Sequence, residues 1–132
     1  MDPTGHTFRK LTEKNGVVIY YTNPNRAKTF TDTNDIINHY NNEISTVGNK
    51  RWVWIFDSDG FDLKQALDIQ SGLGIAKLIT GKCGSNLQEI KIINPTWHIK
   101  AMISAVTPFL DKSTKEKIRV MGDRYYSVLE FI

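Results

Sequence analysis

The sequence predicts an α/β fold in which crossover helices cover a mostly parallel β-sheet. Short β-prone runs alternate with helical segments along the chain, an order typical of consecutive β-α-β units. The run Arg51 to Asp57, RWVWIFD, is apolar on both faces, as strands of a helix-covered parallel sheet are. The chain has 132 residues, 40% of them hydrophobic. This is enough for one core, so we expect residues 1–132 to form a single domain.

The N-terminal third predicts a hairpin followed by a helix. Phe8 to Thr22 contains two β-prone runs around Asn15-Gly16, a pair typical of two-residue hairpin turns. Thr31 or Thr33 is then a suitable N-cap for a helix that extends to about Thr46. The apolar residues that share one face of this helix are Ile36, Ile37, Tyr40 and Ile44.

The strand Arg51 to Asp57 is followed by a predicted helix from Leu63 to about Thr80, with Asp62 as its N-cap and Gly81 at its end. Gly72 and Gly74 lie inside this helix. Because glycine is unfavourable in a helix interior, we expect either a break or close packing there.

The stretch Gln88 to Leu110 joins a strand to an unusual helix. Asn94-Pro95 ends the strand, because proline lacks a ladder donor. Thr96 is a suitable N-cap for a helix that runs to about Val106. Such a helix is either buried or touches something apolar outside the protein. Its apolar residues wrap most of the circumference: Trp97, Ile99, Ala101, Met102, Ile103, Ala105 and Val106.

The C-terminal part predicts a short helical turn from about Thr114 and a strand from Lys117 to Met121. A last helix is expected from about Asp123 to Phe131.

Composition excludes several classes of protein. No apolar run is long enough for a membrane span, and the N-terminus has no apolar signal region. A single cysteine, Cys83, rules out an internal disulfide framework, so we expect a cytoplasmic protein.

Charge is distributed unevenly along the chain. Residues 32–68 hold seven acids and three bases, whereas residues 77–119 hold eight bases and three acids. Basic residues next to an apolar helix suit an anionic membrane surface, although a solvated charged face is the simpler interpretation.

Trp54 to Gly60, with Asp57 and Asp59, resembles the first motif of haloacid-dehalogenase-type phosphatases, in which the first aspartate attacks phosphorus beside Mg²⁺. Phe61 and Asn94 stand where that family has other residues. The alternative is a turn and a helix N-cap.

Other catalytic and cofactor motifs are missing. The glycines near Lys77 do not match a dinucleotide fingerprint, and no Gly-x-Ser-x-Gly elbow occurs. Trp52 and Trp54 alternate within a core-like strand, which favours core packing over stacking on nucleic acid bases. The histidines show no metal-ligand spacing: His6, His39 and His98. We therefore expect no catalytic residue, metal, cofactor or nucleic acid partner.

The segments from Arg51 to Ile132 together resemble a CRAL-TRIO domain, the lipid-transfer fold of the phosphatidylinositol/phosphatidylcholine transfer proteins. Trp52 to Phe61 resembles the family's central strand and its Asp-x-x-Gly-Phe turn, and Val17 to Thr22 fits the place of the first strand. Further blocks follow in the family's order: Gly74 to Leu78, Ile92 to Trp97, Pro108 to Asp111, Thr114 to Ile118 and Gly122 to Ile132.

The resemblance implies a non-enzymatic domain that holds a phospholipid or another hydrophobic ligand in an apolar cavity. The sheet would form the cavity floor, and the helix of residues 96–106 would be a gate that swings against a membrane. The residues expected to line this cavity are Trp54, Phe56, Trp97, Met102, Ile103 and Val106.

The resemblance also implies how such a domain meets a membrane. By position, Thr114 and Lys117 match residues that the family uses at a phosphoinositide headgroup. We expect peripheral membrane contact from Ile99, Lys112, Lys115 and Arg119.

Two departures from the family pattern leave an alternative function open. Cys83-Gly84-Ser85 replaces the family's Tyr-Pro-Glu, which contains a headgroup glutamate, and the usual N-terminal helical preamble is missing. Divergent members with such losses serve as interaction scaffolds. This alternative implies a homodimer or a small-GTPase partner.

Overall fold

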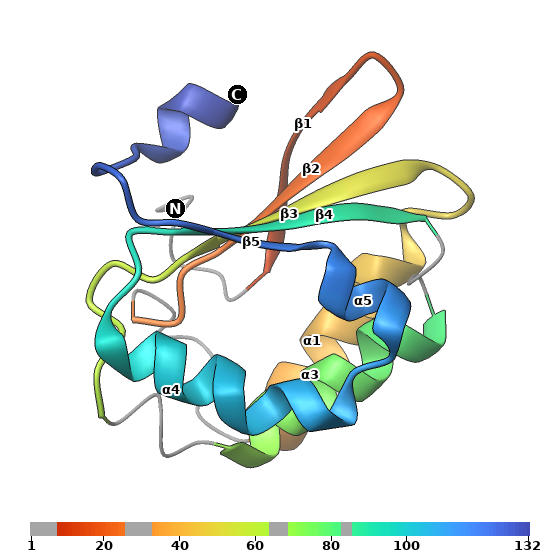
Figure 1. Ribbon diagram of the computed structural model, residues 1–132. Helices are drawn as coiled ribbons and strands as arrows, with labels where there is room; N and C mark the ends of the chain where they lie inside the picture. Colours follow the sequence, from red (N-terminus) through yellow and green to blue (C-terminus); the bar gives the residue numbers. More distant parts are fainter. Residues whose placement is uncertain (1–7, 26–32, 64–68, 83–85) are drawn as a thin grey trace.

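The computed structural model describes residues 8–25, 33–63, 69–82 and 86–132. The predicted alternation of strands and helices is confirmed in these ranges (Figure 1). The elements are β1 (Arg9–Lys14), β2 (Val17–Thr22), α1 (Thr33–Ser45), β3 (Arg51–Asp57), α3 (Ile69–Lys82), β4 (Leu87–Ile93), α4 (Trp97–Val106), the 3-10 helix η1 (Thr107–Phe109), α5 (Lys112–Glu116), β5 (Ile118–Met121) and the 3-10 helix η2 (Val128–Phe131).

The strands form one sheet in the order β1-β2-β3-β4-β5. β1 is antiparallel to β2, and the other three neighbouring pairs are parallel. Helices α1, α3 and α4 lie on one side of the sheet, and the C-terminal segment with η2 lies on the other (Figure 1). The predicted α/β class is therefore confirmed. We call the helix-covered side the inner face and the opposite side the outer face.

The turn between β1 and β2 matches its sequence signal. Asn15 and Gly16 both have positive φ, 53° and 78°. Two consecutive left-handed residues give the turn that matches the twist of a hairpin, and asparagine and glycine adopt this conformation at least cost.

Strand pairing assigns side chains to the two faces. Trp52, Trp54 and Phe56 of β3 lie in the core under the helices, together with residues of α1, α3 and α4. Val53 and Ile55 alternate with them and pack in a second cluster with the C-terminal Tyr126. The strand predicted to be apolar on both faces thus serves two separate cores.

Two predicted helix boundaries change. Gly81 lies inside α3, which ends at Lys82, and Gly72 and Gly74 do not interrupt it. A Cβ at Gly74 would clash with Ile37 Cδ1 of α1, so this glycine permits close helix packing. Thr33 is the first residue of α1 rather than its cap. The predicted cap Thr31 and most of the first turns after Asp62 lie outside the described residues.

The predicted last helix is wrong in type and length. Only Val128–Phe131 is helical, as a 3-10 turn. Ser127 and Glu130 form a capping box at its start, and Arg124 binds the Glu130 carboxylate at 2.7 Å. The segment's own apolar residues, Tyr126, Val128 and Phe131, pack on the outer face of the sheet. A short 3-10 turn is enough to place these side chains on the outer face, so no longer helix forms.

A buried carboxylate joins the strands at their carboxyl ends. Asp57 at the end of β3 is 2% exposed. Tyr21 Oη of β2 donates to Asp57 Oδ2 at 2.7 Å, and Asn94 Nδ2 donates to Oδ1 at 3.1 Å. The Asp59 amide donates to Oδ1 at 3.0 Å. Hydrogen bonds from three segments thus compensate the burial of this charge.

Replacing Tyr21 with Phe should lower the free energy of unfolding by roughly 1.5–3 kcal/mol, because it removes a hydrogen bond to a buried charge. Tyr125→Phe is the matched control: its hydroxyl also donates to an aspartate, Asp59, but the ring is 61% exposed. We expect the control to change stability by less than about 0.5 kcal/mol. Equal losses in urea unfolding of the two variants would contradict the role assigned to Asp57.

Candidate functional site

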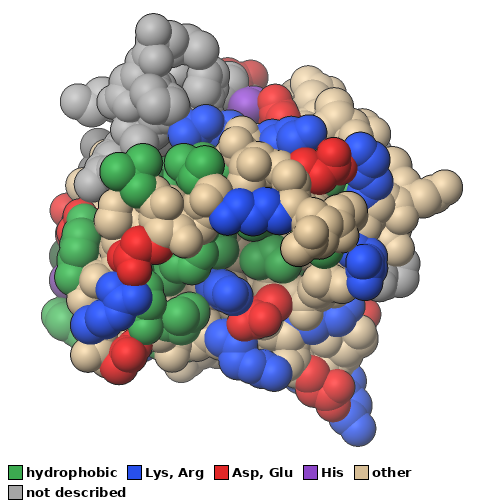
Figure 2. Space-filling model, turned by 90° about the horizontal axis from the view of Figure 1, so that it is seen from above, with side chains coloured by type: hydrophobic (Ala, Val, Ile, Leu, Met, Phe, Trp, Pro, Cys, Tyr) green, Lys and Arg blue, Asp and Glu red, His purple; other side chains and the backbone are tan. Residues whose placement is uncertain are grey.

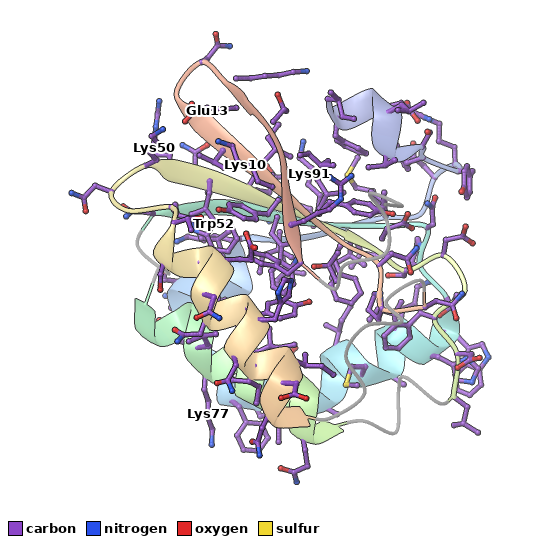
Figure 3. The ribbon with its side chains drawn as sticks, turned by 180° about the vertical axis from the view of Figure 1, so that it is seen from behind. Lys10, Glu13, Lys50, Trp52, Lys77 and Lys91 are labelled. Carbon is purple, nitrogen blue, oxygen red and sulfur yellow. The ribbon has the colours of Figure 1, made fainter. Side chains whose placement is uncertain are left out.

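The inner face of the sheet carries a cluster of aromatic rings. Phe8 stacks on Tyr20 and Tyr40, with ring centroids 4.7 and 4.6 Å apart. Trp52 and Trp54 meet the Phe8 ring edge-on at 6.0 and 5.7 Å. We call these five residues the aromatic cluster. Trp52 lies between the sheet and α1 (Figure 3).

The polar atoms of Trp54 and Tyr40 in this cluster are satisfied by the neighbouring Thr22. Trp54 Nε1 donates to Thr22 Oγ1 at 3.1 Å, and the Thr22 hydroxyl is 3.1 Å from Tyr40 Oη. Burial raises the pKa of the Tyr40 phenol, and the hydrogen bond with Thr22 only partly opposes this. The cluster is therefore a neutral, close-packed floor.

Helix α4 lies over this floor with one apolar stripe. The stripe follows the helical repeat i, i+3, i+4, i+7 and consists of Ile99, Met102, Ile103 and Val106. Ile99 is 3% exposed and belongs to the inner core, against which Met102, Ile103 and Phe56 also pack. The structure therefore brings four predicted cavity residues, Trp54, Phe56, Met102 and Ile103, into one apolar layer.

Helix α3 packs against the same apolar stripe of α4. A Cβ at Gly72 would fall 3.3 Å from Met102 Sδ and 3.5 Å from Val106 Cγ2. The glycine therefore allows α4 to approach closely, which is the close packing that its position predicted. Val106, the remaining residue of the apolar stripe, thus faces α3.

The outer side of α4 is less apolar than the sequence indicated. Ala101, Ser104 and Ala105 are exposed and small. Large exposed rings occur at the two ends, with Trp97 70% and Phe109 of η1 57% exposed. The apolar residues predicted around most of the helix therefore divide into a stripe in which only Ile99 is fully buried, small exposed alanines, and exposed rings at the two ends.

Two predicted site residues exchange surroundings. Trp97, expected in the cavity, lies at the surface and stacks on His98 at 3.9 Å. Ile99, expected at the membrane, is buried. Residue type alone does not distinguish them, because the helical position sets which of the two faces the sheet.

The start of α4 is fixed by short hydrogen bonds. Asn94 has a φ of 52°, a left-handed conformation that asparagine tolerates. Its side chain donates to the Tyr126 carbonyl at 2.9 Å and accepts from the Tyr126 amide at 2.8 Å. Thr96 Oγ1 donates to the Phe61 carbonyl at 2.7 Å and accepts from the Ile99 amide at 3.3 Å. We call residues 94–96 the pivot of α4.

Thr96→Val keeps the side-chain shape but removes both hydrogen bonds, so the free energy of unfolding should fall by roughly 1–3 kcal/mol. Thr107→Val is the control, since the Thr107 hydroxyl bonds back to the Ile103 carbonyl one turn earlier, in the adjoining helix α4. We expect a change below about 1 kcal/mol there. Chemical denaturation of both variants measures the difference, and a larger loss for Thr107→Val would contradict the pivot.

Basic residues gather after α4, around α5. Asp111 caps this helix by accepting from the Thr114 amide at 2.8 Å. Hydrogen bonds from Thr114 hold the pKa of Asp111 below its ordinary value, with smaller contributions from Lys117 and Lys115. Thr114 is 1% exposed and Lys117 is half-buried, whereas the other basic residues of the segment are exposed: Lys112, Lys115 and Arg119.

Sequence reasoning missed part of the floor. Phe8, Tyr20 and Tyr40 are fully buried in the aromatic cluster but were not expected at the site. Register gives the missing signal: Tyr20 pairs with Trp54 between β2 and β3 and therefore shares its face. The sequence alone does not supply that register.

The aspartate motif has a structural role in this fold. Asp57 is buried and accepts hydrogen bonds at both carboxylate oxygens, so its carboxylate is engaged within the fold. Within residues 8–25, 33–63, 69–82 and 86–132, no group of three His, Cys, Asp or Glu side chains could hold a metal ion. None of the helices in the described ranges is long and apolar enough to span a bilayer.

The fold agrees with a comparison against known families. The family model described as CRAL/TRIO domain matches residues 3–132. The chain therefore belongs to the CRAL-TRIO family, whose domains bind or transfer lipophilic ligands and are typically not enzymes. A search of curated proteins found no match.

Proposed function

We propose that this domain binds and transfers a phospholipid or a similar hydrophobic ligand between α4 and the inner face of the sheet. The observation that carries the proposal is the apolar stripe of α4, whose Ile99, Met102 and Ile103 share one core with the aromatic cluster and Phe56. Acyl chains would replace contacts made by Met102, Ile103 and Val106. Trp54 and Phe56 would remain as the floor.

The pivot gives α4 a place from which to swing. The helix is tied to the sheet through Asn94 and Thr96, whereas its stripe holds it only by apolar contacts. Opening would therefore expose Ile99 together with the other stripe residues. Ile99 is a membrane contact in this proposal only in the open state.

In the closed state, the exposed rings of Trp97 and Phe109 would contact the membrane. Trp97 and Phe109 mark the two ends of α4 and η1, and tryptophan is favoured at membrane interfaces. Exposed Lys112, Lys115 and Arg119 would attract anionic lipid. Thr114 and Lys117 remain the candidates for a headgroup that enters beside α5.

Native mass spectrometry of protein purified without detergent should show a bound species of lipid mass. Ile103→Glu should lose it, because the charge would face the apolar floor. Ser104→Glu is the matched control on the exposed side of the same helix turn and should retain it. Ile103→Trp, which fills space without adding charge, should also lower occupancy while the protein stays folded. A parent protein without bound lipid and without transfer between vesicles would refute the proposal.

Trp97→Ala and Phe109→Ala should each weaken partitioning onto phosphatidylserine-containing vesicles at least about tenfold, since each ring contributes about 1.5–3 kcal/mol when buried in lipid. Leu129→Ala and Tyr125→Ala are controls that remove exposed apolar side chains on the opposite side of the molecule. Removing Lys112 and Lys115 should cost about 1 kcal/mol each and reduce the salt dependence. Vesicle sedimentation measures all of these. Equal losses of vesicle binding in the controls would contradict the proposal that the protein meets the membrane through the side that carries α4.

A further inference from the structure

We propose that the free edge of β5 is a self-association site, at which β5 pairs antiparallel with β5 of a second copy of this chain around Val120. The two sheets would join into one continuous sheet. The proposal does not depend on lipid binding, because no residue of the α4 stripe belongs to this edge.

The backbone of β5 presents hydrogen-bonding groups at this edge. β5 is the last strand of the described sheet and pairs only with β4. The Ile90 amide donates to the Lys117 carbonyl at 2.9 Å, and Ile90 is level with Ile118. In a parallel ladder, bonding groups of successive residues point to alternate sides. The amide and carbonyl groups of residues 117, 119 and 121 therefore face β4. The amide and carbonyl groups of Ile118 and Val120 face away from the sheet.

The exposed side chains do not hide this edge. Val120 at its centre is 47% exposed, a large fraction for a β-branched residue in a strand. Arg119 Nη1 donates to the Ile118 carbonyl at 3.1 Å and so covers one outward group. The Arg119 side chain is exposed and can turn away when another amide replaces it. The outward groups of Val120 stay available for pairing.

Two antiparallel registers use these outward groups, and charge favours one of them. Pairing centred on Arg119 places two guanidinium groups directly opposite each other, which is unfavourable. Pairing centred on Val120 sets Val120 against Val120 and Arg119 against Met121. It also brings Lys117, which precedes β5, near Asp123 of the second copy, which follows β5. This attraction occurs twice because the pairing is twofold symmetric.

The other edge of the sheet is protected. The pairing of β1 with β2 shifts between Lys10 and Thr12, and such irregularities disfavour edge-to-edge contact. β1 also carries the charged Glu13, which binds Lys50 at 2.7 Å (Figure 3). β5 has neither a bulge nor a proline. The contrast indicates β5 rather than β1 as the self-association edge.

A twofold axis normal to the sheet keeps equivalent faces on the same side. Both copies would then present α4 in one direction and the C-terminal segment in the other. Figure 2 looks onto the outer face and shows basic and hydrophobic side chains adjoining there. The dimer doubles both surfaces without burying the α4 stripe.

The first test is sedimentation velocity over a concentration series. The parent should self-associate reversibly. Val120→Pro should weaken association at least tenfold, because it removes an outward amide while sparing the ladder to β4. Val120→Lys should also weaken association, because two lysines would face each other at the twofold axis of the dimer. This variant keeps the backbone amide, so its result does not depend on whether proline unfolds the strand. Val120→Thr keeps shape and amide and should retain association. A monomeric parent, or Pro and Lys variants that associate normally, would overturn the proposal.

The second test fixes the register by disulfide cross-linking in a Cys83→Ser background. Directly opposed residues in a non-hydrogen-bonded antiparallel pair have Cα atoms about 4.5 Å apart, within the range of about 4.4–6.8 Å that disulfides span. A mixture of R119C and M121C proteins should therefore give a cross-linked heterodimer. A mixture of K117C and M121C proteins keeps Arg119 and places the two cysteines opposite each other only in the Arg119 register, so a cross-link there would refute ours. No cross-link between R119C and M121C would also refute it. Bound lipid in the same samples, read by native mass spectrometry, reports separately on the proposed function.

Discussion

The carboxylate of Asp57 is the interaction on which the remaining architecture depends. It lies where β2, β3 and β4 end and accepts hydrogen bonds from Tyr21 and Asn94. Asn94 in turn binds both the amide and the carbonyl of Tyr126. One buried charge therefore fixes the ends of three strands, the start of α4 and the seat of the C-terminal segment. A pattern that resembles a phosphatase nucleophile serves here to position a helix.

This arrangement divides the molecule into a rigid part and a looser part. The sheet and the aromatic cluster are held by ladders, stacked rings and satisfied hydroxyls. Helix α4 is bound firmly only at the pivot, and beyond it packs through Ile99, Met102 and Ile103. Apolar contacts lack direction, so they are readily exchanged for contacts with a ligand of the same polarity.

Sequence reasoning succeeded where a local pattern fixes the structure. The Asn15-Gly16 turn, the strand Arg51–Asp57 and the Thr96 cap all follow from neighbouring residues. It failed where distant contacts decide. The segment after Asp123 contains enough helix formers for a helix, yet Tyr126 and Phe131 are drawn onto the outer face and leave only a 3-10 turn. Likewise, the exchanged surroundings of Trp97 and Ile99 depend on the rotation of α4 about its axis, which the sheet imposes.

The contact at Gly72 has a thermodynamic consequence for any motion of α4. The Met102 thioether and a Val106 methyl group of α4 face the backbone of α3 at Gly72, which has no side chain. Separation of α4 from α3 and from the floor would break few directional bonds but would hydrate apolar surface. Such a step has a positive heat capacity change and an enthalpy that grows with temperature. The equilibrium between closed and open α4 would therefore shift increasingly steeply as the temperature rises. A bound acyl chain would weaken this temperature dependence, because it would keep the same apolar surface away from water.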